Sequence, residues 1–458
     1  RFDGSSATIR SRSVCALGAR REISTSRRNG FGSYYKQKIA IICFTMRILH
    51  TSDWHLGQSF MGKSRQMEHQ ALIDWLIVQV HEHAVDAVLI AGDIFDTGTP
   101  PSYARELYSQ LVVRLHEARV ALLLLGGNHD SVSTLRENSA LLECLSANVV
   151  PHADAPENQI RVLPLRRADA QRTPGCIVCA IPFIRARDVI QSEAGRSAED
   201  KRLQLMHSIQ SYYRATFEAA RELRDALSKE MGRCLPLIAT GHLTTVGASS
   251  TESVREIYVG TLDAFPTTAF PPVDYLALGH IHRPQKVGGL EHIRYSGSPI
   301  PLSFDEASQQ KEMLLVDLDE SGLAAVTPLP VPVFQRLVTL RGNLDSLAEA
   351  FARIARDATP DRPVWLEVTV AEDDYLSELP ARIQALAEGL ALEVLRIRRE
   401  RSNIAAHLSA DAGITLDELD PHDVFSRRLE NEDLTDCLRQ SLTERYRAIV
   451  VAACEDAA

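Results

Sequence analysis

The stretch Arg47-Ile-Leu-His-Thr-Ser-Asp-Trp-His-Leu-Gly57 joins a short apolar run to a loop with two metal-type ligands. The apolar run followed by small polar residues is typical of a buried strand that ends in a loop. Asp53 and His55 are two residues apart, so on an extended backbone their side chains point the same way. A carboxylate and an imidazole side by side can bind one metal ion. An ordinary turn often contains the same pair, so further ligands must come from elsewhere in the chain.

From Met46 onward, strand-like apolar runs alternate with helical patterns. The predicted helices are 66–83, 102–119, 134–145 and 199–230, and the predicted strands are 87–91, 120–125, 177–181, 235–239, 275–278 and 313–318. This alternation favours an α/β layered fold with buried sheets. In such folds, functional sites form in the loops at the carboxyl ends of the strands.

The segment Val326-Thr-Pro-Leu-Pro-Val-Pro332 is proline-rich and predicts a break between domains. Beyond it, strands at 335–340, 364–370 and 392–396 and helices at 344–355 and 376–387 predict a small α+β domain. The chain then becomes acidic and loop-like, and ends in helical patterns near 421–429 and 434–450. We therefore expect a leader at 1–45, a first domain at 46–330, a second at 333–401 and a C-terminal segment at 402–458.

Composition bounds the class of protein. The 458 residues are 45% hydrophobic, enough for large cores, and the formal net charge is −10, which argues against a uniformly basic nucleic-acid binder. No apolar run reaches the roughly 18 residues that a membrane span needs, so we expect a soluble, cytoplasmic protein. Eight cysteines in a chain of this length do not predict a disulfide framework. Cys176-Ile-Val-Cys179 has metal-site spacing but no second pair, so we expect neither a zinc site nor a redox role there.

The first 45 residues differ from the rest, with nine Lys and Arg, two acids and many serines. Such a composition is typical of an organellar transit peptide. The interpretation we favour is that translation begins at Met46 and that 1–45 is a non-native or disordered leader, which we exclude from the fold. The remainder, 46–458, has 41 basic and 58 acidic residues, a net charge of −17.

Five loops that follow predicted strands carry metal-type ligands, and four of them lie beside glycine, which lets an ion approach closely. The residues are Asp53 with His55, Asp93, Asn128 with His129, His242, and His280 with His282. Carboxylate, amide and imidazole ligands without thiolate suit Mn²⁺, Fe²⁺ or Zn²⁺ and not a structural zinc site. So many ligands exceed the need of one tetrahedral ion and predict two ions that share a bridging carboxylate. Two metal ions bound side by side are common in enzymes that hydrolyse phosphate esters. The ions also supply positive charge that this acidic chain lacks.

The set Asp-x-His, Gly-Asp, Gly-Asn-His-Asp, His and Gly-His-x-His resembles the signature of the calcineurin-like metallophosphoesterase superfamily. The resemblance narrows further, to the SbcD family of nuclease subunits of bacterial SbcCD complexes. It rests on the 46–57 stretch, on Gly92-Asp-Ile-Phe-Asp-Thr97, on Gly127-Asn-His-Asp130 and on Tyr295-Ser-Gly-Ser-Pro-Ile-Pro-Leu-Ser-Phe-Asp-Glu306. It covers Met46 to the C-terminus, is strongest to about residue 310, and does not include 1–45.

The resemblance implies a site and a fold. One metal ion would be held by Asp53, His55, Asp93 and His282, and the other by Asp93, Asn128, His242 and His280, with Mn²⁺ the expected metal. His129 would be the catalytic residue that protonates the leaving oxygen, although the sequence alone equally allows it to orient a neighbouring ligand. The fold would be a metallophosphoesterase β-sandwich flanked by helices, followed by a small capping domain and C-terminal helices.

The resemblance also implies partners. The capping domain would contact DNA, either through Arg396, Arg398, Arg399 and Arg401 or with that cluster as a solvated surface. The helices at 66–83 and 102–119 would form a homodimer within a heterotetramer, unless they pack only on their own sheet. The segment Leu416-Asp-Glu-Leu-Asp-Pro-His-Asp-Val-Phe-Ser-Arg-Arg-Leu429 and the helix after it would bind the coiled-coil base of the ATPase SbcC, or fold back on the capping domain.

The expected activity is that of a 3′→5′ exonuclease on double-stranded ends and an endonuclease on hairpins, in DNA repair, recombination and replication. The chain has no Gly-x₄-Gly-Lys-[Ser/Thr] phosphate loop, so any ATP dependence must come from SbcC. Two alternatives stay open: a phosphoesterase for small phosphodiesters or phosphoproteins, and a non-catalytic DNA-end scaffold. The complete ligand set disfavours the scaffold, and the added C-terminal domains disfavour a small-molecule enzyme.

Overall fold

The computed structural model describes residues 45–166, 173–190, 197–254, 264–371, 378–399 and 436–455, together with Phe425 and Leu429. The chain divides into two compact units, 1–43 and 44–458. Apart from Thr45, the predicted leader lies outside the described residues. So does most of 402–435, with the predicted SbcC-binding stretch and Arg401.

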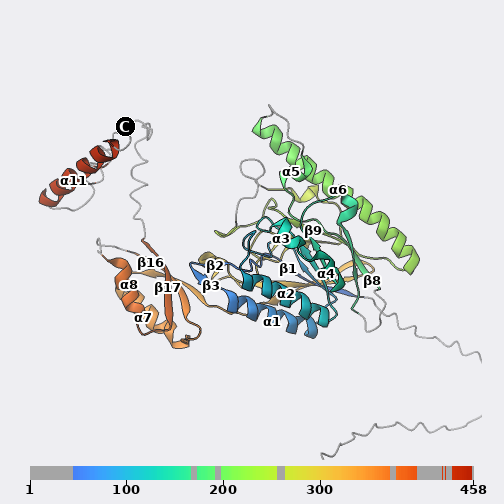
Figure 1. The fold of residues 1–458 in the computed structure, drawn as a ribbon, viewed down its shortest axis with the longest axis horizontal. Coiled ribbons are helices and arrows are strands. Elements are labelled where there is room, and N and C mark those ends of the chain that lie inside the picture. The colour runs from blue at the N-terminus through green and yellow to red at the C-terminus, as the bar shows by residue number, and fades with distance from the viewer. Residues whose placement is uncertain are drawn as a thin grey trace, which may run out of the picture. The chain divides into compact units, whose positions relative to one another are not determined.

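Two six-stranded sheets form the first domain (Figure 1). The first has the order β14 (Gly322–Pro330), β13 (Glu312–Asp319), β1 (Met46–Thr51), β4 (Ala87–Ile90), β5 (Ala121–Leu125) and β6 (Ala147–Val150). The second has the order β11 (Gln285–Val287), β12 (Leu290–Tyr295), β10 (Tyr275–Gly279), β9 (Leu237–His242), β8 (Pro174–Cys179) and β7 (Ile160–Pro164). Four neighbouring strands of each sheet are parallel, β1–β4–β5–β6 in one and β8–β9–β10–β12 in the other. Within each sheet their carboxyl ends therefore meet at one edge.

Three apolar cores hold the layers together. Residues that alternate along β4 face opposite sides: Leu89 belongs to the core between the sheets, whereas Val88 packs toward helices. Those helices are α1 (Gln66–Glu82) and α2 (Ser102–Glu117), which cover the first sheet. The long helix α6 (Ala198–Met231) covers the second sheet through side chains such as Tyr213. The predicted α/β layered fold is confirmed as a β-sandwich with helices on both outer faces.

One local prediction is wrong. The helix predicted over 134–145 is two short helices, α3 (Val132–Arg136) and α4 (Ser139–Cys144), because Asn138 between them adopts a left-handed conformation with φ of 60°. The proline-rich segment, predicted as a break between domains, includes the last residues of strand β14, which continues to Pro330. Within its sheet β14 pairs with β13 alone, and an edge strand tolerates prolines, which cannot donate to a neighbour.

Cys176 and Cys179 both lie buried in β8 but on opposite faces of the sheet. Cys176 belongs to the core between the sheets and Cys179 to the core beneath α6. Residues three apart on a strand point in opposite directions, so these two thiols cannot share one metal ion. Burial also raises the pKa of Cys179 to about 12, which keeps its thiol protonated. The spacing is therefore that of two core residues.

The second domain, for which we keep the name capping domain, spans Leu337 to Arg399 and is a small sheet with its own core. Its three parallel strands, β15 (Leu337–Gly342), β16 (Val364–Val370) and β17 (Leu392–Arg399), are joined by α7 (Leu344–Ile354) and α8 (Leu379–Ala387). Phe351, Leu366 and Ile383 are fully buried in that core. Further along the chain, α11 (Asp436–Glu455) corresponds to the helix predicted near 434–450.

The remaining elements are short. They are β2 (Ser59–Phe60), β3 (Lys63–Ser64), α5 (Ala186–Val189), η1 (Pro156–Gln159), η2 (Thr267–Ala269), η3 (Phe304–Glu306) and η4 (Ala355–Asp357). A cluster of Phe60, Phe304, Leu337 and Trp365 joins the β2–β3 hairpin and η3 to the first strands of the capping domain.

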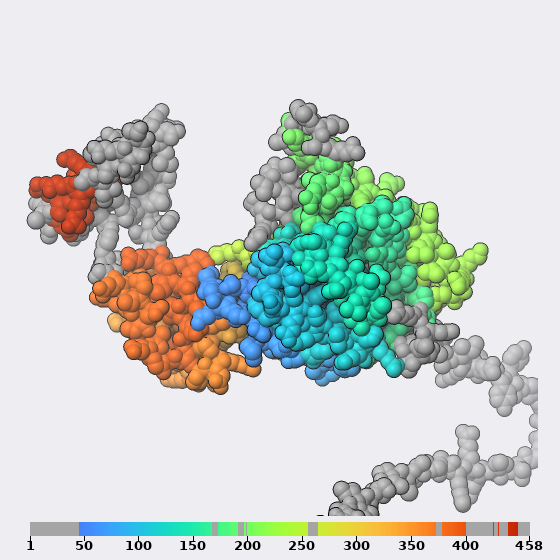
Figure 2. Space-filling view, viewed as in Figure 1, coloured from blue at the N-terminus to red at the C-terminus, as the bar shows by residue number. Residues whose placement is uncertain are grey.

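Helices α1 and α2 form one continuous outer surface of the first domain, blue to teal in Figure 2. Three apolar side chains on them are exposed: Met67 (81%), Val78 and Val113. Both helices also pack inward on their own sheet, so the outward apolar residues are additional to those needed for the core. Among the described helices, none combines the length and apolar character that crossing a membrane requires.

Candidate metal centre

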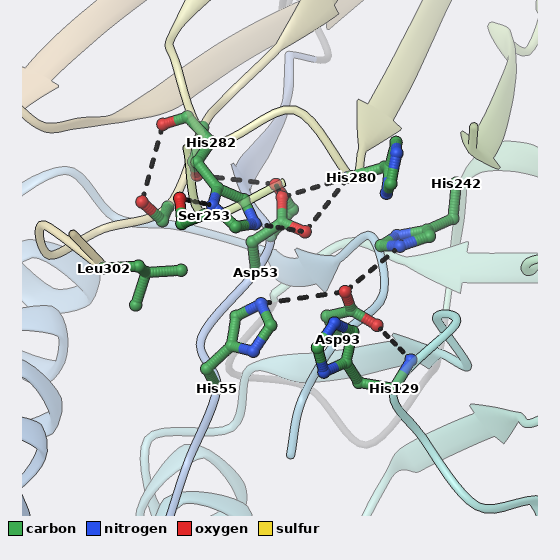
Figure 3. Close-up of polar contacts among 12 residues, drawn as sticks. Asp53, His55, Asp93, His129, His242, Ser253, His280, His282 and Leu302 are labelled. Carbon is green, nitrogen blue, oxygen red and sulfur yellow. Dashed lines mark hydrogen bonds and ion pairs between the residues drawn. The ribbon is translucent and has the colours of Figure 1, made fainter. Parts of the chain in front are cut away.

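All eight predicted site residues lie together where the parallel strands of both sheets end, and Figure 3 labels each of them except Asn128. Loops after β1, β4, β5 and β10, together with the last residue of β9, supply them. Six are buried, whereas Asn128 and His129 are half-buried. Three overlapping groups have ligand atoms within 4.8 Å of one another: Asp53 with His55 and His282, His55 with Asp93 and His129, and Asp53 with Asp93 and His242.

Asp93 is at the centre of these contacts. Its Oδ2 lies 3.3 Å from His242 Nε2 and 3.7 Å from His55 Nε2. Its Oδ1 accepts a hydrogen bond of 2.9 Å from the backbone N–H of His129. One carboxylate thus faces ligands from both sheets, as a bridge between two ions must.

Asp53 and Asn128 extend the cluster to either side. Asp53 Oδ1 lies 4.0 Å from His282 Nε2 and accepts the backbone N–H of His280 at 3.0 Å. Asn128 Oδ1 lies 2.8 Å from His242 Nε2 and 3.2 Å from His280 Nδ1. Every ligand-type side chain that the sequence predicted therefore contacts at least one other member of the set.

The imidazoles are oriented for metal binding. His242 Nδ1 donates to the carbonyl of Ala91 at 2.9 Å, and His55 Nδ1 donates to Asp96 Oδ1 at 3.1 Å, because those oxygens can only accept. When the rings are neutral, each Nε2 then carries a lone pair, and that lone pair faces the oxygens of Asp93. A lone pair against a carboxylate is repulsive unless a proton or a metal ion lies between them. His55 Nε2 and His280 Nε2 are buried without a hydrogen-bond partner, so the residues present fit bound metal ions.

The electrostatics point the same way. Burial lowers the pKa of His242, but the carboxylates of Asp93 and Asp53 outweigh it and bring that pKa to about 9. Burial raises the pKa of Asp93, yet His242, His55 and His129 hold it well below its usual range. The pocket therefore keeps its carboxylate ionised and attracts positive charge to the place where the imidazoles meet it.

Backbone conformation at the site is unusual. Asp53, His55, Asp93 and His280 have φ values of 55°, 48°, 51° and 92°, in the left-handed region that side chains other than glycine seldom adopt. Strained residues of this kind cluster at functional sites. Here the conformation turns each side chain from the strand end into the shared pocket.

Gly92→Ala should abolish metal binding. Gly92 has a φ of 96°, and a Cβ there would lie 2.2 Å from His242 Nδ1, which displaces that ring from Asp93. We expect a lower midpoint of thermal unfolding and loss of bound Mn²⁺, measured by differential scanning fluorimetry and by metal analysis after gel filtration. Gly62→Ala is the matched control, because Gly62 also has a positive φ but nothing lies within 4 Å of its Cβ position. Equal metal content in the two variants would contradict the geometry.

Sequence reasoning missed several residues around the ligands. Asp130, which is part of the quoted Gly-Asn-His-Asp motif, accepts the backbone N–H groups of Ile94, Phe95 and Gly127 at 2.9–3.1 Å. It thereby joins the loops that carry Asp93 and Asn128. Burial and the nearby Asp93 carboxylate raise its pKa to about 6.

A second missed group lies behind His282 and consists of Ser253, Glu306 and Lys311. Burial raises the pKa of Glu306, but His282 and Lys311 hold it well below its usual range, so the carboxylate is ionised. Glu306 is the last residue of the Tyr295–Glu306 motif, which supported the family resemblance, so this motif could have indicated its importance. Ser253 and Lys311 have no comparable signal in the sequence.

Two of the arginines predicted at the capping domain, Arg396 and Arg398, are paired with acids. Arg396 and Arg398 both contact Glu367, and both also approach Glu252 of the first domain, at 3.8 and 3.5 Å. Arg396 also stacks over the ring of Phe304. These two arginines are therefore bound to acidic side chains from both domains, which neither the DNA-contact nor the solvated-surface interpretation anticipated.

Both domains of the chain match known protein families. Residues 46–284 match the family described as Calcineurin-like phosphoesterase, and residues 333–433 match the Type 5 capsule protein repressor C-terminal domain. The chain is 48% identical over 402 residues to the SbcD component of the nuclease SbcCD from Escherichia coli (strain K12), covering 88% of this chain and 97% of that protein. It is 34% identical to the protein of the same name from Rhodobacter capsulatus, over 80% of this chain and 90% of that one. The relative from Bacillus subtilis (strain 168) is 28% identical, over 72% and 81%.

Both family matches coincide with parts of the described fold, since the first contains all eight site residues and the second contains the capping domain. A calcineurin-like phosphoesterase is an enzyme that uses divalent metal ions, as the ligand cluster requires. The chain therefore belongs to the SbcD family of nuclease subunits, within the calcineurin-like phosphoesterases.

Proposed function

We propose that this chain is a two-metal nuclease that hydrolyses phosphodiester bonds in DNA. The observation that carries the proposal is the convergence of two imidazoles on one buried carboxylate: Asp93 Oδ2 lies 3.3 Å from His242 Nε2 and 3.7 Å from His55 Nε2, which is buried without a hydrogen-bond partner. Two divalent ions in such a pocket activate water and neutralise charge on a phosphodiester. The relatives named as components of a nuclease support DNA as the substrate.

The contacts support the following division of ligands. Asp53, His55, Asp93 and His282 would hold one ion, and Asp93, Asn128, His242 and His280 would hold the other. The group of Asp53, His55 and His282 contains only proposed ligands of the first ion, and so does the group of His55, Asp93 and His129 once His129 is left aside. Asn128 contacts His242 and His280, the two histidines proposed for the second ion. Mn²⁺ is the metal we propose, because mixed oxygen and imidazole ligands suit it.

His129 is the residue that we propose handles the proton. Its Nδ1 donates to the carbonyl of Asp96 at 2.7 Å, and its ring lies edge-on to that of His55, with centroids 4.6 Å apart. These contacts fix the ring beside the ligands, while its partial exposure leaves it accessible to a substrate. A histidine in that position can protonate the leaving 3′ oxygen.

The test is a cleavage assay with purified full-length chain and Mn²⁺. Linear double-stranded DNA labelled at either end and a hairpin oligonucleotide are the substrates, with bis(p-nitrophenyl) phosphate as a small phosphodiester. We expect cleavage of DNA that EDTA abolishes and that addition of SbcC and ATP accelerates on double-stranded ends. Loss of label from the 3′ end first would support the proposed 3′→5′ polarity. Hydrolysis of the small ester alone would favour the small-molecule alternative, and inactivity on every substrate would favour the scaffold.

Removal of residues 402–458 should separate catalysis from assembly. We propose that this segment, most of which lies outside the described residues, binds an SbcC-type ATPase in the cytoplasm. The truncated chain should keep Mn²⁺-dependent hairpin cleavage but no longer co-purify with SbcC in an affinity capture. Light scattering then measures the mass of the complex that the full-length chain forms. A full-length complex with the mass of two copies of each protein would support the proposed heterotetramer, and SbcC binding by the truncated chain would refute the assignment.

A further inference from the structure

A buried carboxylate outside the proposed ligand set lies behind His282. Glu306, at the end of η3, is fully buried, and its two oxygens face different groups. Oε1 accepts hydrogen bonds from the hydroxyls of Ser253 and Thr251 and lies 3.4 Å from His282 Nδ1. Oε2 accepts from Lys311 Nζ at 2.7 Å. The carboxylate thus connects a buried cation to one ring of the metal centre.

Ser253 lies between that carboxylate and the ring of His282, and Figure 3 shows Ser253 beside His282. Its hydroxyl donates to Glu306 Oε1, so its oxygen is available to accept the Nδ1–H of His282, 2.6 Å away. This order of donors fixes the tautomer of His282 with its proton on Nδ1. The lone pair is then on Nε2, the nitrogen that lies nearest to Asp53 Oδ1.

Lys311 holds the group from the opposite side. Besides Glu306, its ammonium donates to the backbone carbonyl of His282 at 2.9 Å and to Ser298 Oγ at 3.0 Å. A buried lysine paired with a buried glutamate needs such additional partners to offset the loss of solvation. The lysine therefore fixes both the main chain of His282 and the carboxylate that orients its ring.

The two residues before Ser253, Thr251 and Glu252, hold this segment in place through their own contacts. Thr251 donates to Glu306, the backbone N–H of Glu252 donates to Asp305 Oδ2 at 3.0 Å, and the Glu252 side chain reaches Arg398 on β17. The position of the Ser253 hydroxyl is therefore determined by contacts to η3 and to the capping domain.

We propose that Glu306 and Ser253 are positioning residues that orient His282 for the metal ion on the Asp53 side. The inference rests on the proposed two-metal site. It predicts an effect confined to one ion: without the Ser253–Glu306 pair, the His282 ring can rotate or change tautomer, and only the ion that it binds is weakened. Groups that orient a metal ligand in this way typically contribute 10–100-fold in affinity.

The experiment measures Mn²⁺ binding by the full-length chain, by titration and by electron paramagnetic resonance, which distinguishes a coupled pair of Mn²⁺ ions from a single ion. Glu306→Gln and Ser253→Ala should each bind one ion as tightly as wild type and the second about 10–100-fold more weakly, with the spectrum of a single ion at low occupancy. Ser253→Thr keeps the hydroxyl and should restore the coupled spectrum.

Glu68→Gln is the matched control. Glu68 is also a buried glutamate paired with a buried cation, Arg65, but it contacts no proposed ligand. It should lower the midpoint of thermal unfolding and leave both ions bound. Wild-type Mn²⁺ affinity at both sites in Ser253→Ala, or equal metal loss in Glu68→Gln, would overturn the inference. If the wild-type chain itself binds no pair of ions, the proposed function fails instead, so the two outcomes are distinct.

Discussion

Asp93→Asn should give a folded chain that binds neither metal ion and cleaves no DNA. Asp93 faces His242 and His55 through one oxygen and the backbone of His129 through the other. Asparagine has the same shape, so the hydrogen bond from His129 can persist. Its amide nitrogen, however, would donate to the imidazole lone pairs that the ions need. The variant thus removes the bridging charge and fills the ligand positions with a neutral donor.

The same substitution should weaken the metal-free fold. Without metal, the carboxylate of Asp93 is paired with His242, which lowers the pKa of Asp93 and raises that of His242, and removing one partner of a buried pair is destabilising. We expect the midpoint of thermal unfolding in EDTA to fall below that of wild type, while Mn²⁺, which raises the wild-type midpoint by mass action, leaves the variant unchanged. Asp317→Asn, which removes a partly exposed carboxylate paired with Arg47, is the control and should keep the full Mn²⁺ response. A variant that retains two ions would refute Asp93 as the bridge.

His129→Ala should lower the rate of DNA cleavage by at least about 100-fold while both ions remain bound. General acids contribute about 10²–10⁴-fold, and the two-ion clamp would be intact. The measurement is single-turnover cleavage of a hairpin at saturating Mn²⁺, together with the number of ions bound per chain. His152→Ala, at a half-buried histidine that contacts Arg136 away from the site, is the control and should cleave at the wild-type rate.

The metal count decides between two roles for His129. Its ring lies in one of the ligand-atom groups, with His55 and Asp93, so geometry alone also allows it to bind an ion. If His129→Ala loses an ion along with its activity, then His129 is a ligand. If it keeps both ions and its activity, then the proton-transfer role is wrong.

The ligands were predictable from the sequence because they lie at the ends of strands, and strands have a recognisable apolar pattern. Each ligand follows a strand whose apolar residues are apparent in the sequence, and parallel strands bring their ends to one edge. Asp93 and His242 are far apart in the chain, yet both were predictable from the strands before them. The quoted motifs then narrowed the site to one family.

The groups behind the ligands could not be predicted in this way. Ser253 lies in a loop, and its partner Glu306 is 53 residues further along the chain, so no local pattern indicates that they meet. The break at Asn138 was missed for a related reason, since the apolar spacing around it suits one helix and only the backbone at Asn138 interrupts it. The prolines of β14 hid the strand from the sequence pattern. A strand tolerates prolines when it lies at the edge of a sheet, and the edge position of β14 is a property of the whole sheet.

The left-handed backbone at Asp53, His55, Asp93 and His280 has a consequence for engineering. A residue with a side chain pays about 1–2 kcal/mol for that conformation, whereas glycine adopts it freely. At Asp53 and Asp93 glycine would also remove the acceptors of the backbone N–H groups of His280 and His129, which offsets the gain. A directed-evolution screen that rewards only heat resistance, run in a chelating buffer, should therefore enrich glycine at His55 and His280 and discard the catalyst. With saturating Mn²⁺ present, the same screen should retain all four side chains, because the ions stabilise only chains that can bind them.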